Sequence, residues 1–221
     1  MEIKTETIKY DSEWEKFFKS EAKKIKKALG KNCVAVHHIR DTSFKSDVCV
    51  LNGKITIFAM AVVKNIEAST LDFLREIGYK QEVHEGYKKE GDPEIILWIT
   101  PLARDNEAIM CELSLRDYMA AHPEKAKEYA EYIEKEALNS ADILSLSAKR
   151  ESYFEKLRPE IDKWVKEQNN FSFGLSMGMC FGMSIGTAIG AAMGNIAIGM
   201  TMGMSVGMCL GIAIGSAKNK K

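Results

Sequence analysis

From residue 168 to the C-terminus the sequence contains no aspartate or glutamate, and its only charged residues there are Lys218, Lys220 and Lys221. Since three of the 31 basic residues lie in this stretch, the preceding part carries 28 basic against 31 acidic residues, a net charge of −3. Domains that bind nucleic acid are usually basic. The charge distribution therefore argues against a nucleic-acid partner for the body of the protein.

Signals for metal binding and for disulfides are also missing. The five cysteines form no C-x-x-C pair, and no histidine stands at a metal-ligand spacing from them. His37 and His38 are adjacent, and adjacent residues of a strand point to opposite faces, so they would not share one ion. We expect no metal site. Scattered, unpaired cysteines and the absence of a signal peptide at Met1 predict a cytoplasmic protein with reduced thiols.

Residues 1–168 alternate between helical and strand patterns. Apolar residues recur with a helical period over residues 12–29, and residues 33–39 and 54–63 are apolar runs typical of strands. The second run is nearly continuous, which predicts a central strand covered on both faces. A short helix, two strands around a polar turn, and helices from Leu115 onward follow, with Pro159 predicting a kink or a restart. This order predicts an α+β domain with one sheet.

Four segments of this body carry a family resemblance. They are IKYDSEWEKFFKSEAKKIKKALG, CVAVHHI, LREIGY and LSLRDYMAAHPEKAKEYAEYIEKEAL, in which R-D-Y-x-x-x-H-P-E at residues 116–124 is the most specific piece. They resemble the GrpB (UPF0157) family over residues 7–168. The resemblance implies the fold of the nucleotidyltransferase superfamily, a small mixed sheet with packed helices. It implies little about activity, because the activity of the family is poorly established.

The resemblance also identifies what this chain has replaced. The family pattern H-I-G-S-T-[AS]-V-P-G-L is followed by A-K-P-[IV]-I-D; in nucleotidyltransferases the Gly-Ser turn meets the triphosphate and strand acids hold Mg²⁺. Here Gly-Ser is Arg40-Asp41, Pro-Gly is Lys45-Ser46, and Phe58 stands where the acid belongs. A glycine cradle for phosphate accommodates neither bulk nor a carboxylate. The comparison implies a binding module rather than an enzyme, with no assigned catalytic residue and no cofactor.

A rebuilt nucleotide site is the alternative to that interpretation. Polar residues follow the first strand, and two more charged residues are expected at the start of a helix, where an acid is also favourable without any ligand. An active enzyme on a nucleotide substrate would use this pocket together with Mg²⁺. The candidates for the pocket are His38, Thr42, Ser43, Asp47, Arg116 and Asp117.

Residues 174–217 repeat the pattern Gly–large–small–large every four residues. Each glycine costs a helix about 1 kcal/mol relative to alanine, but small residues four apart let helices approach closely, as in the glycine zippers that this segment resembles. The alternation also has the period of a strand, although glycine and methionine are weak strand residues. We predict a helical hairpin over residues 169–221, turned at Gly194-Asn195. Its packing or self-association is expected through Gly178, Gly182, Gly186, Gly190, Gly199, Gly203, Gly207 and Gly211.

The hairpin has the length of a membrane span. Residues 174–194 would form a helix about 31 Å long, against a hydrocarbon core of about 30 Å. Its few strongly apolar residues contribute only about −2 kcal/mol to insertion, so the paired hairpin is the plausible inserting unit. Lysines flank both ends, which predicts a membrane-anchored protein with both ends in the cytoplasm. The alternatives are a soluble self-associating module and a membrane-active protein whose body keeps it soluble.

Overall fold

The computed structural model describes residues 4–66, 68–82, 86–102, 106–140 and 142–218. The chain forms two compact units, residues 1–158 and 159–221, and each is described by itself. The division falls at Pro159, ten residues before the start of the predicted hairpin domain. Pro159 lies inside helix α5 (Ile143–Ala192), which continues through it without a break, so the predicted restart is wrong. A proline removes one hydrogen bond, and a helix of this length retains the others.

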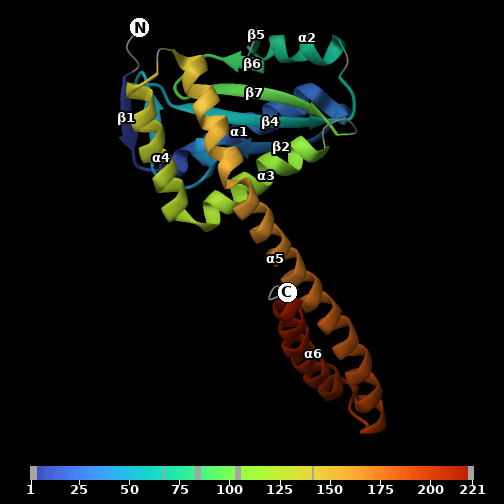
Figure 1. Cartoon of the computed structure of the whole chain (residues 1–221). Coiled ribbons are helices and arrows are strands. Elements are labelled where there is room, and N and C mark those ends of the chain that lie inside the picture. Colours follow the sequence, from blue (N-terminus) through green and yellow to red (C-terminus); the bar gives the residue numbers. More distant parts are fainter. Residues whose placement is uncertain (1–3, 67, 83–85, 103–105, 141, 219–221) are drawn as a thin grey trace. The chain divides into compact units, whose positions relative to one another are not determined.

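The first unit is built on a five-stranded mixed sheet (Figure 1), in the order β2-β4-β7-β6-β5. The central β4 pairs antiparallel with β2 and parallel with β7. The segment after α2, predicted as two strands around a polar turn, forms three strands, β5, β6 and β7. Strands β5 and β6 are short and pair with each other, and their polar sequence carries no apolar pattern from which both could be predicted. The strands are β2 (Cys33–Ile39), β4 (Thr56–Val63), β5 (Lys80–Glu82), β6 (Gly86–Lys89) and β7 (Glu94–Pro101).

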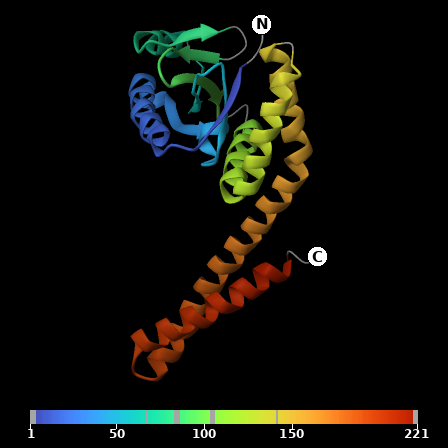
Figure 2. The same ribbon diagram turned by 90° about the vertical axis from the view of Figure 1, so that its left-hand side faces the viewer.

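Strand β4 is covered on both faces, as its apolar sequence predicts. Ile57, Ala59, Ala61 and Val63 belong to a core shared with α1 (Ser12–Leu29) and Leu74 of α2 (Ala68–Glu76). The alternate residues Met60 and Val62 pack with Ile109 of α3 (Asn106–Ala121) on the other face. The two-residue alternation of a strand thus divides one apolar run between two helical layers, which Figure 2 shows from the side.

A second, two-stranded sheet and two further helices complete this unit. Strand β1 (Thr5–Ile8) pairs antiparallel with β3 (Val48–Leu51), and α4 (Pro123–Leu138) lies against both. Short 3₁₀ turns, η1 (Gly30–Asn32) and η2 (Asp41–Ser43), precede and follow β2. Residues 143–158 of α5 bury Leu146 and Phe154. The predicted α+β class, with a small mixed sheet and packed helices, is confirmed.

The second unit is a helical hairpin. Helix α5 ends at Ala192, the chain turns at Gly194, whose φ of +72° suits glycine, and α6 (Ile196–Lys218) returns antiparallel. Asn195 caps α6 by accepting a hydrogen bond from the backbone N–H of Ile198 at 3.2 Å. The predicted C-terminal hairpin is confirmed, and its helical form shows that the strand alternative is wrong.

Glycine meets glycine along the whole contact between α5 and α6. A Cβ added at Gly182 would lie 2.8 Å from the Cα of Gly207, and closer still to the carbonyl oxygen of Gly203. No side chain fits such a spacing, so each glycine is required by the backbone of the opposite helix. The same contact recurs in five rows, formed by Gly174 and Gly215, Gly178 and Gly211, Gly182 and Gly207, Gly186 and Gly203, and Gly190 and Gly199.

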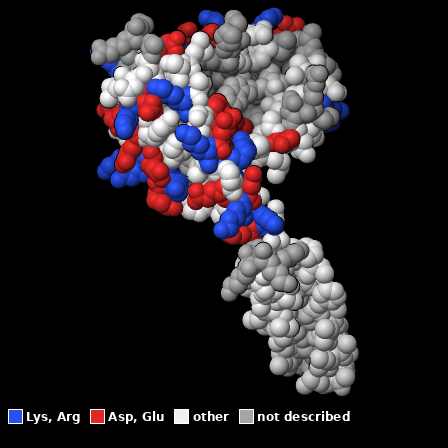
Figure 3. Space-filling view, in the orientation of Figure 1, with Lys and Arg blue, Asp and Glu red and all other residues white. Residues whose placement is uncertain are grey.

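The large side chains of the hairpin point outward. Phe181, Ile185 and Leu210 are each about 60% exposed. Residues 168–217 contain no charged side chain, and Figure 3 shows the lower part of the hairpin entirely white or grey. Hydroxyls of the outer stripe bond to their own helix; Ser184, for example, donates to the carbonyl of Cys180 at 2.9 Å. By length and composition, two helices that contain these segments are apolar enough to cross a membrane.

Candidate functional site

The turn after edge strand β2 separates two cavities, and the first collects most of the residues predicted to form a pocket. This cavity of about 380 Å³ lies beside His37 and His38, between α1 and α3. Its lining includes five of the six predicted pocket residues, His38, Thr42, Ser43, Arg116 and Asp117, whereas Asp47 does not line it. We call it the histidine pocket.

His38 is held in the histidine pocket by an aromatic ring and a hydroxyl group. Its imidazole stacks on Phe18 of α1, with ring centroids 4.6 Å apart, and its Nε2 is 2.9 Å from the hydroxyl oxygen of Thr42. Burial lowers the pKa of His38 to about 4, against the opposing effect of Glu15. His38 is therefore a neutral hydrogen-bonding partner at physiological pH. Thr42 is itself only 1% exposed, which restricts the access of any substrate to its hydroxyl.

The low pKa of His38 predicts a pH-dependent stability. The unfolded chain binds a proton at this imidazole below its ordinary pKa of 6.5, whereas the folded chain does not until about pH 4. Above pH 6.5 the imidazole is neutral in both states, and the free energy of unfolding does not depend on its titration. Between pH 6.5 and 4 we expect the free energy of unfolding to fall by about 1.4 kcal/mol for each unit that the pH is lowered. Urea unfolding at pH 7 and pH 5 should show a smaller loss for His38→Gln than for the wild type; equal losses would contradict the assignment.

Arg116 and Asp117 occupy a different place on their helix than predicted. Helix α3 begins at Asn106, so the two residues lie in its C-terminal half rather than at its start. The helix begins earlier because Ile109 and Leu113, four residues apart, pack against Met60 and Val62 of β4. Arg116 pairs with Asp117 at 2.7 Å at the rim of the histidine pocket. The two charges of this pair offset each other, and Lys45 and the Glu15–Lys19 pair also line the pocket.

The other side of the same turn holds a buried charge cluster that the sequence did not predict. Arg40 has a φ of +63°, a backbone conformation that favours glycine. Its guanidinium donates to Glu112 at 2.7 Å and pairs with Glu151 at 3.0 Å. It also lies 5.0 Å from the ring centroid of Trp98 and 5.3 Å from that of Phe154. Paired and stacked in this way, Arg40 is held by the protein itself.

Asp41 faces into the protein instead of toward solvent. Its carboxylate accepts hydrogen bonds from the Tyr129 hydroxyl at 3.0 Å and from the Arg150 guanidinium at 2.9 Å. Burial acts against the charged form of Arg150, but Asp41 and the neighbouring acidic groups raise its pKa. Arg150 and Asp41 therefore form an internal ion pair between α5 and the turn.

A second cavity, of about 370 Å³, opens beside this ion pair. Arg150, Asp41 and Phe58 line it, together with Lys54 and Lys88. The Nε of Arg150 is buried and has no acceptor among the described residues. We call this cavity the arginine pocket. Glu94 also lines it and pairs with Lys88 at 3.1 Å, so the pocket holds two cation–carboxylate pairs and Lys54 next to an aromatic ring.

Phe58 makes the arginine pocket unsuited to magnesium. It lies on β4 opposite Ile39 and forms an edge contact with Trp98, with centroids 5.9 Å apart. Mg²⁺ takes oxygen ligands, whereas Phe58 offers none. The Asp41 carboxylate is bound to Arg150, and that of Glu94 to Thr56 and Lys88. Within the described ranges, no three His, Cys, Asp or Glu side chains are placed to hold a metal ion. The residues at this turn do not fit the ion.

The residues that sequence reasoning missed come from distant segments. Asp41 and Arg150 are 109 positions apart, and Arg40 and Glu112 are 72 apart. Only Tyr129 carried a local signal, since it falls on the apolar stripe of α4 with Ala126 and Ile133. Glu112 and Arg150 lie on helices whose charged residues are typical of a face exposed to solvent, so the sequence does not distinguish these two as buried.

The first unit has the α+β class of fold, with helices on both faces of a five-stranded mixed sheet. The family model described as GrpB protein matches residues 4–167. The chain belongs to the GrpB family.

Two known proteins are similar to it. The UPF0157 protein YqkA of Bacillus subtilis (strain 168) is 27% identical over 175 residues, 76% of this chain and 50% of that protein. The chain thus spans about half the length of this curated relative. The crystal structure of conserved protein GrpB from Enterococcus faecalis matches with a TM-score of 0.56 and 22% identity, covering 72% of this chain and 99% of that one. This second similarity concerns the fold.

Proposed function

We propose that this protein is a membrane-tethered binding module: a GrpB domain that does not transfer nucleotidyl groups, held at the cytoplasmic face of a membrane by its C-terminal hairpin. The observation that carries the proposal is the outward-facing apolar surface of a hairpin whose helices contact each other through glycine. The boundary between domain and tether is placed at residues 168–169, where acidic residues cease.

The loss of catalysis is inferred from the turn after β2. If the family shares the nucleotidyltransferase fold, Arg40 and Asp41 stand at the phosphate-binding turn and Phe58 at the metal-binding strand position. Arg40 is committed to Glu112, and Asp41 to Arg150, so neither is available to a metal–phosphate complex. The arginine pocket retains donors for an anion, and a nucleotide is the ligand class that we propose for it.

The membrane tether is inferred from the balance of polar and apolar groups in the hairpin. Helix α6 is about 35 Å long, enough to cross a hydrocarbon core of about 30 Å. The hydroxyls of Ser176, Ser184 and Ser205 are satisfied by carbonyls of their own helix, which removes most of the cost of placing them in lipid. We place the body and both hairpin ends in the cytoplasm because lysines flank the hairpin and its tip is uncharged.

Replacing Ile185 by lysine is expected to release the full-length protein from membranes. A lysine near the middle of a span costs about 3 kcal/mol, more than the marginal insertion energy of one arm. The measurement is the membrane-bound fraction after an alkaline carbonate wash. Ile66→Lys, the same change at a residue 54% exposed in the first unit, serves as the control and should stay membrane-bound. Wild-type protein found in the wash would contradict the tether.

Self-association is the competing use of the hairpin. The glycines that we expected to mediate it contact each other within one chain, so we propose that copies associate through the outer small residues such as Cys180 and Cys209, which are exposed. If the wild-type protein is released by the carbonate wash and sediments as a large assembly, a soluble oligomeric module is favoured. Leakage of vesicles caused by the wild type and not by Ile185→Lys would favour a membrane-active protein.

A second candidate function, an active nucleotide enzyme, is favoured by the 2.9 Å contact between His38 and Thr42. A neutral histidine beside a hydroxyl is the arrangement of an activated nucleophile. We nevertheless expect no turnover when the full-length protein is incubated with nucleoside triphosphates and Mg²⁺, measured as released phosphate or pyrophosphate. Turnover that disappears in Thr42→Val would establish the enzyme and overturn the binding-module proposal.

A further inference from the structure

The exposed side of α1 carries two kinds of lysine. Lys16, Lys19 and Lys24 each pair with a glutamate three or four residues earlier in the helix. No acidic residue stands between Glu21 and Asp41. Four exposed lysines of this stretch form no ion pair with a residue that the structure describes; they are Lys23, Lys26, Lys27 and Lys31, which we call the lysine face.

The stability of α1 does not explain the lysine face. Lys23 lies three and four residues before Lys26 and Lys27, so the three side chains share one side of the helix, where like charges repel. Lysines of the last turn gain from the helix dipole, which accounts for Lys26 and Lys27. The dipole does not account for Lys23, which lies one turn earlier, or for Lys31, which lies beyond the helix in η1. A partner with negative charge would relieve the repulsion.

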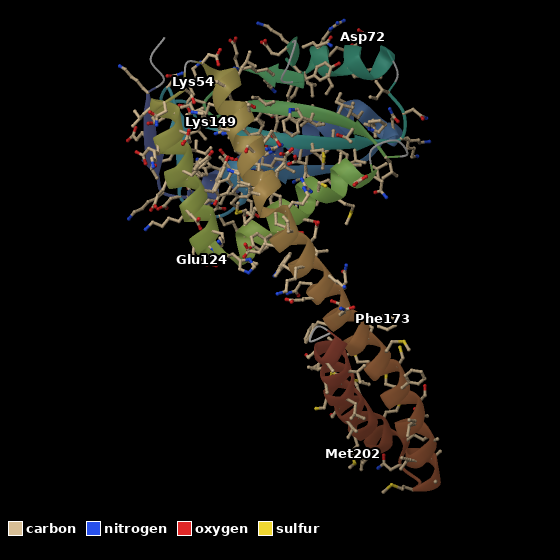
Figure 4. The ribbon with its side chains drawn as sticks, in the orientation of Figure 1. Lys54, Asp72, Glu124, Lys149, Phe173 and Met202 are labelled. Atoms are coloured by element: carbon tan, nitrogen blue, oxygen red, sulfur yellow. The ribbon has the colours of Figure 1, made fainter. Side chains whose placement is uncertain are left out.

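The elements packed against α1 do not supply the missing acids. Strands β2 and β4 lie against it and contain no acidic residue, and α2 is its helical neighbour. In α2, Asp72, labelled in Figure 4, pairs with Arg75 at 3.1 Å, which leaves Glu76 as the remaining acid of that helix. Lys64, whose backbone N–H donates to the carbonyl of Asn32, adds a positive charge near Lys31. The charge of the lysine face is therefore not balanced by its neighbours.

The proposed tether brings an anionic surface within reach of the first unit. Only residues 159–167 of α5, about 14 Å of helix, separate this unit from the uncharged stretch. They contain three acidic residues and two lysines, so they offer no net positive charge to a membrane themselves. The potential of an anionic leaflet falls off within a Debye length, about 8 Å at physiological salt. A basic helix face is typical of a membrane-surface contact at this range.

We propose that the lysine face of α1 docks the GrpB domain onto anionic lipid headgroups of the cytoplasmic leaflet. The inference rests on the proposed tether and adds an orientation to it. Helix α1 faces the lipid, and α4, on the opposite side of the sheet (Figure 2), faces the cytoplasm. Helix α4 carries five glutamates and three lysines, so the same leaflet repels it.

The test uses the full-length protein in vesicles of phosphatidylcholine with or without phosphatidylglycerol. Cys111, Cys180 and Cys209 are replaced by serine, since Cys33 and Cys49 are buried. A bimane label is then placed beside the lysine face by Ser20→Cys, or on α4 by Leu138→Cys; both residues are exposed. A nitroxide on the phosphatidylcholine headgroup quenches the label at short range, and the fluorescence lifetimes give the ratio of docked to undocked protein.

We expect quenching at Ser20→Cys in the vesicles that contain phosphatidylglycerol, and no quenching at Leu138→Cys. Salt at about 1 M, where the Debye length is about 3 Å, should abolish it. Lys23→Gln combined with Lys27→Gln should lower the docked-to-undocked ratio roughly 30-fold, the effect of removing two lysines from an anionic surface. Lys127→Gln combined with Lys135→Gln makes the same change of charge on exposed lysines of α4 and should leave the ratio unchanged.

The docking and the tether fail in different ways. Equal quenching at Ser20→Cys and Leu138→Cys overturns the docking, because it would mean that the domain has no preferred side. Quenching that persists in the Lys23→Gln, Lys27→Gln variant overturns it too, since the lysines would not be the contact. Protein that resists the alkaline carbonate wash while its Ser20→Cys label is not quenched keeps the tether and overturns the docking. Protein that the wash releases overturns the tether, and the docking falls with it.

Discussion

Gly182→Leu is expected to force the two helices of the hairpin apart. A Cβ at this position would already lie 2.8 Å from the Cα of Gly207 and would overlap still more with the Gly203 carbonyl oxygen. These are backbone atoms, so no side-chain rotation relieves the overlap. Ordinary helix pairs are 8–10 Å apart because side chains separate them. We expect an increase in helix separation on the order of 3 Å, with a broader distribution.

The native cysteines provide the measurement. Cys180 and Cys209 lie on the exposed outer sides of α5 and α6, and the glycine rows place them at the same level. With Cys111 replaced by serine, nitroxides on these two cysteines report the distance across the hairpin by pulsed electron paramagnetic resonance. Ser184→Leu adds the same bulk to the exposed outer face and should leave the distance unchanged. An unaltered distance in Gly182→Leu would show that the glycine contact does not hold the helices together.

The hairpin also illustrates how far the sequence determines this structure. A four-residue repeat with a one-residue shift at Gly194-Asn195 predicts two helices and their turn, because both signals are local. The repeat places glycine on one face and Ser, Cys, Thr or Ala on the opposite one, and either stripe permits close packing. Only the structure shows that glycine is on the inner side. The sequence alone therefore predicted close helix packing without distinguishing contacts within a chain from contacts between chains.

In the sheet and the candidate site too, features with a local sequence signal were predictable, whereas features that join distant segments were not. Strand β4 was predictable since ten consecutive residues carry its signal, whereas β1 and β3 form a separate two-stranded sheet and have four residues each. The histidine pocket was largely predictable because His38 lies near the end of β2, and Thr42 and Ser43 follow that strand. The arginine cluster was not, since its ion pairs join residues more than 70 positions apart. Hydrophobic periodicity does not encode which of many charged residues will be buried.

Arg150→Met is expected to destabilise the first unit strongly. The side chains of Arg150 and Asp41 are 17% and 10% exposed, so the methionine leaves a buried carboxylate with Tyr129 as its remaining described donor. Removing one partner of a buried ion pair typically costs about 3–5 kcal/mol. For a protein of this size the unfolding temperature should fall on the order of 10 °C. Thermal unfolding followed by tryptophan fluorescence measures the change.

Two further variants separate the ion pair from other effects of the substitution. Lys149→Met changes the adjacent residue, whose pair with Glu136 is more exposed, and should cost no more than about 1 kcal/mol. Asp41→Asn combined with Arg150→Met removes both charges, while the Tyr129 hydroxyl can still donate to the asparagine oxygen. We expect this double variant to recover most of the lost stability, because the cost arises from the unpaired buried charge. If the double variant is as unstable as Arg150→Met, packing of the arginine side chain, and not its charge, stabilises the contact between α5 and the turn.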